Sequence, residues 1–274
     1  MGLQRVLKIR DRYTIMKIFD LSVPTEDSPS EPFPLKVEHQ THQDSAAAVA
    51  NFFEATIDDL PEGNGWANDT VTLIAHAGTH VDAPWHYYPT CMGDPTCGGS
   101  RARTIDELPL EWFYGDGVVL DMRHKPHGGL ITSEDVQEAL SKIAYDLKPG
   151  DIVLIQTGAD KTWGQAAYFE AGAGMSAGAT RWLIEQGIRV MGIDTWGWDQ
   201  PFWAMKERFK ETGDPAVIWE AHRVGMDLEY CQIEKLANLD QLPRPTGFKV
   251  SCFPVKLTGG SAGWARVVAM FEDL

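Results

Sequence analysis

The chain has 274 residues, a formal net charge of −15 and an apolar content of 43%, which is ordinary for a folded globular protein. Its acidic balance argues against nucleic acid and anionic membrane surfaces as partners, because both attract basic patches. No run of eighteen apolar residues occurs, so no segment is expected to span a membrane. The N-terminal stretch contains no apolar core of signal-peptide length, and a cytoplasmic location is therefore expected.

Short apolar runs rich in valine and isoleucine alternate with amphipathic stretches from end to end of the chain. The runs predict strands at 15–22, 70–76, 117–122, 151–157, 188–194, 248–255 and 265–271. Amphipathic periodicity and capping residues predict helices at 132–147, 176–187 and 202–213. Segment 23–69 is the least regular, and we expect a loop there that could cover a site. Since no linker, repeat or low-complexity tract appears, we expect residues 1–274 to form a single α/β domain.

One stretch, "HAGTHVDAPWH" at 76–86, concentrates metal-ligand side chains. The ligand-type residues are His76, His80, Asp82 and His86. All have even numbers, so an extended strand would place them on one face, but its outer histidines would then lie roughly 33 Å apart. Gly78 and Pro84 disfavour a continuous helix and allow the chain to bend. We expect the strand at 70–76 to deliver His76 at its end, and a turn at Gly78 to bring the next two ligands back beside it.

Three imidazoles and a carboxylate that converge would repel as cations or lose solvation unless a metal ion lies between them. The alternative, which is the better interpretation for any single histidine, is an ordinary surface or hydrogen-bonded residue. The clustering favours the metal, because the whole chain holds only 8 histidines. Nitrogen and oxygen ligands without a thiolate suit Zn²⁺, Mn²⁺ or Fe²⁺, and three ligands from one segment leave positions open for water. The pattern therefore predicts a hydrolytic metal site.

The same segment resembles the HxGTHxDxPxH signature of the cyclase-type metal-dependent hydrolases, a family that includes kynurenine formamidases and isatin hydrolases. Further stretches resemble successive blocks of its longer members, at 103–122, 149–161, 192–199, 220–243 and 247–269. The resemblance extends from about residue 16 to the C-terminus. It implies a swivelling β/β/α fold, in which a mixed sheet or barrel is flanked by helices, and this agrees with the elements predicted above.

The resemblance also implies roles for individual residues. The family's metal ligands are matched by His76, His80 and Asp82. His86 matches its catalytic base, although a structural histidine is the alternative there. His222 and Glu234 match a downstream pair that either holds a second metal, bridged by the aspartate, or lies near the substrate; they could also be an ordinary pair in which Glu234 merely orients His222. Mn²⁺ is favoured by analogy with isatin hydrolase and Zn²⁺ is the alternative. A homo-oligomer, dimer or higher, is implied as well.

This arrangement suits hydrolysis. A bound divalent ion can lower the pKa of its water towards about 7 and polarise a carbonyl group. His86 lies outside the tight 76–82 turn but near it, so it could accept the water's proton and return it to a leaving nitrogen. A non-catalytic, metal-dependent binding protein is the alternative, and it would have no use for His86.

The aromatic residues suggest a substrate class. Those expected to contact substrate are Phe53 and Trp66 in the irregular segment, Trp85 inside the motif, and Trp196 and Trp198 after the strand at 188–194. An aromatic, apolar pocket fits a small aromatic amide. The favoured reaction opens a cyclic amide such as isatin, because the chain is longer than the compact formamidases. Removal of the formyl group from N-formylkynurenine is the alternative.

Overall fold

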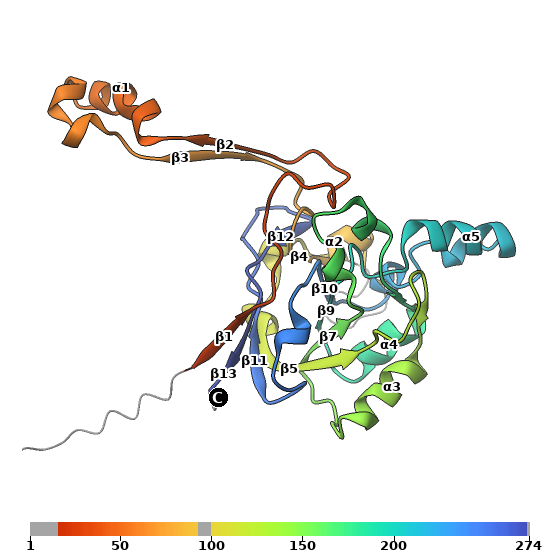
Figure 1. The fold of residues 1–274 in the computed structure, drawn as a ribbon. Helices are drawn as coiled ribbons and strands as arrows, with labels where there is room; N and C mark the ends of the chain where they lie inside the picture. Colours follow the sequence, from red (N-terminus) through yellow and green to blue (C-terminus); the bar gives the residue numbers. More distant parts are fainter. Residues whose placement is uncertain (1–15, 93–99, 273–274) are drawn as a thin grey trace, which may run out of the picture.

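The computed structural model describes residues 16–92 and 100–272, and its body is built around one large, curled mixed sheet (Figure 1). The nine strands lie in the order β1-β13-β11-β5-β7-β9-β10-β4-β12. In that order they are Lys17–Asp20, Val268–Phe271, Phe248–Ser251, Tyr114–Asp121, Ile152–Gln156, Val190–Ile193, Cys231–Glu234, His80–Asp82 and Ala262–Trp264. The mixed α/β fold expected from the sequence is confirmed.

The centre of the sheet is parallel and apolar on both faces. β5, β7, β9 and β10 run parallel, with Leu154 of β7 lying between Val119 and Gly192 of its neighbours. Alternate residues of these strands enter two different cores. One core joins the sheet to α3 (Ser133–Lys142) and α4 (Ala177–Glu185), and the other includes residues of β11 and β13. Burial on both faces explains why β7, β9 and the second half of β5 are apolar runs in the sequence.

The three predicted helices are present, with one shorter than expected. Helix α3 begins at Thr132, whose side chain and Asp135 form a reciprocal capping box. It ends at Lys142 rather than at 147, because Ala144 adopts a left-handed φ of 50° that stops the helical path. Helix α4 follows its Ser176 cap as predicted, and α5 (Phe202–Thr212) ends at a glycine with φ of 66°. A single-turn helix, α2 (Pro84–Tyr87), closes the histidine segment.

A long arm projects from the body between β1 and β4 (Figure 1). Strands β2 (Lys36–Gln40) and β3 (Asn68–Thr72) pair as an antiparallel ribbon, and α1 (His42–Phe52) lies at its tip. The expectation of an irregular loop over 23–69 is therefore wrong for the arm. Thr41 caps α1 in a capping box with Asp44, a local signal that is present in the sequence.

The strand predicted at 70–76 is part of this ribbon, not of the central sheet. It ends at Thr72, and all of its residues are exposed. His76 is thus delivered by a turn after the arm, not by a strand end. The other six predicted strands are confirmed at β1, β5, β7, β9, β11 and β13; β5 begins earlier than expected, at Tyr114, and the other five are shorter than expected.

Three short strands that the sequence did not predict, β4, β10 and β12, complete the sheet at one edge. Each has only three or four residues, and polar side chains interrupt the apolar pattern of β4 and β10. A separate two-stranded parallel pair is formed by β6 (Leu130–Ile131) and β8 (Gly174–Met175). Within residues 16–92 and 100–272, no helix is long and apolar enough to cross a membrane.

Candidate metal centre and its pocket

Two antiparallel strands near one edge of the sheet, β4 and β10, bring the acidic and imidazole groups together. In the register of β4 and β10, His80 lies opposite Glu234 and Asp82 lies opposite Gln232. His80 and Asp82 are two residues apart on a strand, so their side chains point to the same face. Both are completely buried. The pairing of two chain segments more than 150 residues apart therefore fixes the centre of the site.

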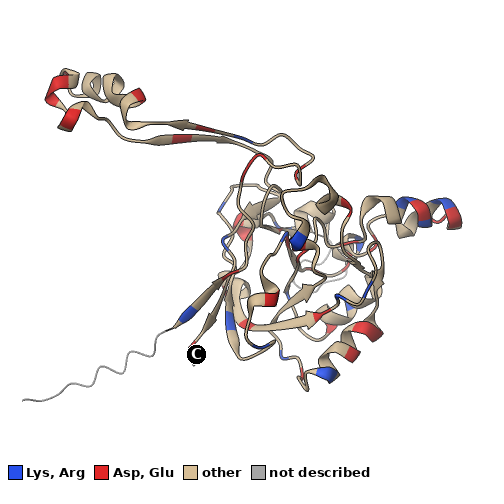
Figure 2. Cartoon of the chain, in the orientation of Figure 1, with Lys and Arg blue, Asp and Glu red and all other residues tan. Residues whose placement is uncertain are grey.

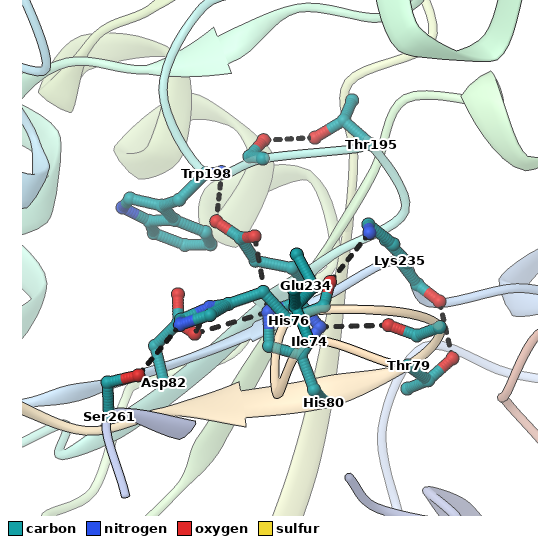
Figure 3. A network of polar contacts seen from close by, with 12 residues as sticks. Ile74, His76, Thr79, His80, Asp82, Thr195, Trp198, Glu234, Lys235 and Ser261 are labelled. Atoms are coloured by element: carbon teal, nitrogen blue, oxygen red, sulfur yellow. Dashed lines mark hydrogen bonds and ion pairs between the residues drawn. The ribbon is translucent and has the colours of Figure 1, made fainter. Parts of the chain in front are cut away.

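His76 reaches the same point from the preceding turn. Gly78 has a φ of 63°, a left-handed conformation that a residue with a side chain rarely adopts, and this lets the chain reverse before β4. The Nδ1 atom of His76 lies 2.8 Å from Oδ1 of Asp82, and Nε2 of His80 lies 3.1 Å from the same oxygen (Figure 3). The bend expected between His76 and His80 is confirmed.

Hydrogen bonds at the far side of each ring select the nitrogen that faces the centre. The Nδ1 atom of His80 contacts the carbonyl of Gly78 at 2.8 Å, which leaves Nε2 turned towards Asp82. Nε2 of His76 contacts Oγ of Ser261 at 3.0 Å, which leaves Nδ1 turned inward. Outer hydrogen bonds of this kind fix the tautomer and orientation of histidine ligands in metal sites.

The residues present fit a divalent metal. Ligand atoms of His76, His80 and Asp82 all lie within 4.8 Å of one another, and so do those of Asp82, His86 and His222. Nε2 of His80 and both carboxylate oxygens of Asp82 are buried and have no hydrogen-bond partner among the described residues. Buried polar atoms left in this state are costly unless something else satisfies them. Asp82 belongs to both groups, as expected of a carboxylate that bridges two ions.

The electrostatics of the centre arise from opposed effects. Burial alone would lower the pKa of His80, but the carboxylates of Asp82 and Glu234 raise it to about 9. Burial alone would raise the pKa of Asp82, but the surrounding histidines hold it well below its usual value. The carboxylates therefore carry full negative charge in the cluster, and a cation at its centre would neutralise them.

His86 lies on α2, across the cluster from β4 and β10. Its ring centre is 4.1 Å from that of His76 and 5.4 Å from that of His222. Burial lowers its pKa to about 4, with the charge of Asp82 opposing this shift only in part. The imidazole is therefore neutral near pH 7 and able to accept a proton.

His222 is held by a carboxylate that the sequence did not single out. Its Nδ1 atom lies 2.5 Å from Oδ2 of Asp199, whose two oxygens also accept the backbone N–H groups of Ala221 and His222. Burial lowers the pKa of His222, but Asp199 more than compensates and raises it to about 8. The Nε2 atom is left facing Glu234, 3.9 Å from its Oε1.

Glu234 closes the centre from β10. Its Oε1 accepts the backbone N–H of Trp198 at 2.9 Å, and its Oε2 lies 3.5 Å from Nε2 of His80. Contacts with His80 and His222 lower its pKa, against the effect of burial and of the nearby Asp82 charge. The side chain of Glu234 thus lies near one histidine from each of the two candidate ligand groups, His80 and His222.

A cavity of about 300 Å³ opens directly onto this cluster. Its floor includes His76, His86, His222 and Glu234. Its walls are mostly apolar and aromatic, and include Phe33, Ile74, Phe169, Trp196, Phe202 and Trp219. Trp219 stacks on the ring of His222 with 5.2 Å between ring centres. An apolar pocket with a few convergent polar groups is the usual form of a small-molecule site.

The structure brings only part of the predicted aromatic set to this pocket. Trp196 is on its wall. Trp198 is fully buried in the core, where its indole N–H donates to Thr180, and only its backbone contacts the site. Phe53 and Trp66 lie on the arm, 69% and 48% exposed, and Trp85 packs beside Arg101 outside the cavity lining.

Several site residues were missed by sequence reasoning. Asp199 and Trp219 lie within or next to the blocks 192–199 and 220–243, and a carboxylate just after a strand end was a usable signal for Asp199. Phe33 comes from the segment before the arm, which no local pattern links to the site. Ser261 lies in the block 247–269, where nothing in the local sequence links it to the histidine segment.

Comparison with known proteins agrees with this geometry. The sequence profile of the Cyclase family, described as "Putative cyclase", matches residues 19–200. Kynurenine formamidase of Salinibacter ruber (strain DSM 13855 / M31) is 23% identical over 205 residues, which cover 73% of this chain and 77% of the formamidase. Isatin hydrolase A from Labrenzia aggregata, solved with benzyl benzoate, is 25% identical, has a TM-score of 0.69 and matches over 94% of both chains. A solved potential metal-dependent hydrolase with cyclase activity is 22% identical, with a TM-score of 0.57 over 93% of this chain and 98% of its own.

The fold and the histidine–carboxylate centre together define a hydrolase that depends on a metal ion. Since the family profile covers residues 19–200, which are most of the chain and include the entire histidine segment, this chain belongs to the Cyclase family of metal-dependent hydrolases.

Proposed function

We propose that the chain hydrolyses an amide bond of a small aromatic substrate, using a divalent ion held by His76, His80 and Asp82. The observation that carries this proposal is the continuity of the cavity, whose aromatic walls and histidine floor belong to one space. A flat ring packed against Trp196 and Phe202 in this cavity would direct its polar edge to the cluster. A divalent ion bound there would supply Lewis acidity to a carbonyl oxygen and acidify water.

The protein's own residues would perform the proton transfers. His86 is neutral near pH 7 and faces the cavity, so it can accept a proton from water and return it to the leaving nitrogen. His222, oriented by Asp199, presents Nε2 to the same space, where it can hold a second ion or contact the substrate. Glu234 lies between His222 and His80 and can serve either arrangement.

We favour a cyclic amide of the isatin type, with Mn²⁺ as the metal. The match to an isatin hydrolase over 94% of both chains supports this choice. N-formylkynurenine with Zn²⁺ is the second candidate, supported by the relative named as a kynurenine formamidase.

A direct assay separates the two candidates. The protein is stripped with chelator, reloaded with Mn²⁺ or Zn²⁺, and given isatin and N-formylkynurenine side by side. Metal-dependent loss of isatin absorbance is the expected result. Preference for N-formylkynurenine would replace the ring-opening reaction with deformylation, and inactivity on both would reject this substrate class.

A binding protein without turnover is distinguished by His86→Ala. If the protein is an enzyme, this variant should keep the substrate and the ion held by His76, His80 and Asp82, but lose about 10²–10⁴-fold in kcat. His124→Ala, at an exposed histidine outside the pocket, is the matched control and should keep full activity. Equal behaviour of the two variants would favour the binding protein.

We also propose that the protein is a homo-oligomer in which the arm packs against a second copy. Apolar rings on the arm are exposed, with Phe52 at 75% and Phe53 at 69%, although large apolar side chains gain free energy when buried. From 37 to 73 the arm has seven acidic residues and no lysine or arginine, and its tip is acidic in Figure 2. The loop 253–257 on the body offers complementary chemistry, since it exposes Phe253, Val255 and Leu257 around Lys256. A second copy supplies this loop to each arm.

A further inference from the structure

A buried ion pair lies directly behind the metal ligands and has no part in the reaction proposed above. Nζ of Lys235 donates to both carboxylate oxygens of Glu31, each at 2.8 Å. The two side chains are only 1% and 2% exposed. Taking two charges out of water costs several kcal/mol per ion, and a single ion pair often fails to recover that cost. A contribution to stability alone therefore does not explain why this pair is buried.

Each member of the pair makes further contacts, and these go to the segment that carries the ligands. Lys235 also donates to the backbone carbonyl of His76 at 2.8 Å (Figure 3). Glu31 accepts the backbone N–H of Gly78 at 2.7 Å through Oε1. The carbonyl of that glycine in turn contacts Nδ1 of His80. The pair is thus hydrogen-bonded to the turn that places two of the three ligands.

The same pair contacts the substrate pocket. Nζ of Lys235 lies 4.8 Å from the ring centre of Trp196, a cation–π contact with a pocket wall. Phe33, two residues after Glu31, lines the opposite side of the wall and packs against Trp196 with 6.3 Å between ring centres. Lys235 also directly follows Glu234, the last residue of β10, so a shift of Lys235 would move the backbone beside that carboxylate.

We propose that Glu31 and Lys235 are positioning residues that hold the 76–80 turn and the Phe33–Trp196 wall in register, so that the metal and the substrate are presented to each other. Four chain segments meet at this pair: the loop before the arm, the ligand turn, the end of β10 and the strand end after β9. The part of this inference that concerns substrate rests on the proposed function, whereas the part that concerns the ligand turn does not.

The test uses isosteric variants and two readouts. Lys235→Met, Glu31→Gln and the double variant keep side-chain size while removing one or both charges. Lys125→Met is the control, because it removes a half-buried pair with Asp135 on α3, outside the pocket. The readouts are the dissociation constant for Zn²⁺ by titration calorimetry on stripped protein, and kcat and KM separately for the amide that wild-type protein hydrolyses.

Each single variant should bind Zn²⁺ about 10–100-fold more weakly, the range found when groups that support metal ligands are removed. KM should rise, because the pocket wall loses its support. The double variant should lose about as much Zn²⁺ affinity as one single variant, because the two charges act together as one ion pair. The control should match wild-type protein in both readouts.

Unchanged Zn²⁺ affinity in folded single variants would overturn the inference. So would a double variant whose fold-loss of Zn²⁺ affinity equals the product of the fold-losses in the two single variants. If a single variant fails to fold, the double variant, which leaves no unpaired buried charge, still decides the question. Should wild-type protein bind Zn²⁺ but hydrolyse no amide, the proposed function fails while the calorimetry still tests the positioning role.

Discussion

At the scale of single residues, three of the four imidazoles of the site each have one nitrogen committed to an outer partner. Ser261, the Gly78 carbonyl and Asp199 take the outer nitrogens of His76, His80 and His222. These outer contacts set the tautomer of each of the three rings, so that its other nitrogen faces the centre of the site. His86 lacks such an outer hydrogen bond among the described contacts and stays neutral, which suits a group that must take up and release a proton.

The Asp199 contact gives a prediction at this scale. Asp199→Asn keeps the shape of the side chain but removes the charge that orients His222, so kcat/KM should fall about 10–100-fold. Asp227→Asn, at an exposed partner of Arg181, should change nothing. The measurement is steady-state kinetics on metal-loaded protein, and equal activity of both variants would show that Asp199 has only a structural role.

The sequence predicted residues better than it predicted their environment. Spacing and ligand chemistry singled out His76, His80 and Asp82, because a metal site depends on donor types that are visible in the letters. Asp199 and Glu31 were missed, because they meet their partners only through pairing between distant segments. Trp198 was expected to contact substrate, yet its ring lies in the core, since a position after a strand end does not reveal which way a side chain points.

At the scale of elements, the short strands on one side of the sheet and the arm are the parts that local pattern could not place. The buried parallel strands β5, β7 and β9 contain apolar runs and were predicted, whereas β4, β10 and β12 have only three or four residues each, and β4 and β10 carry polar groups of the site. The ribbon of the arm resembles a sheet strand in sequence, but β3 is exposed along its whole length. Propensity alone cannot separate these two settings.

The arm gives the prediction at this scale. The double variant Phe52→Ser and Phe53→Ser should convert the proposed oligomer to a monomer, because the exposed apolar rings of the arm are removed. Leu110→Ser, at a 66% exposed leucine on the body, is the control and should keep the wild-type assembly. Sedimentation velocity gives the mass of each species. Wild-type protein that sediments as a monomer would contradict the proposal.

At the scale of the whole molecule, the candidate metal centre joins four parts of the fold. Strands β4 and β10, helix α2 and the segment around His222 each contribute to one cluster with two buried carboxylates. The folded chain should therefore be more stable with metal than without. Free ion at one hundred times its dissociation constant adds about 2.7 kcal/mol to the free energy of unfolding.

For a chain of this size that gain corresponds to a rise in Tm of about 5 °C or more. The measurement is thermal unfolding of stripped protein with and without Mn²⁺ or Zn²⁺. Mg²⁺, which prefers oxygen ligands, serves as the control ion and should shift Tm much less. Equal unfolding temperatures with and without Mn²⁺ and Zn²⁺ would show that the cluster does not bind these ions in the folded chain.

The most direct test of the central claim is titration calorimetry of stripped wild-type protein and Asp82→Asn with Mn²⁺ and Zn²⁺, followed by an amide hydrolysis assay on the same samples. Because both candidate ligand groups share Asp82, the variant should bind every ion at least about 100-fold more weakly, and hydrolysis should be lost with it. The wild-type stoichiometry would give the number of ions. Wild-type affinity in folded Asp82→Asn, or no binding by the stripped wild-type protein, would contradict the account.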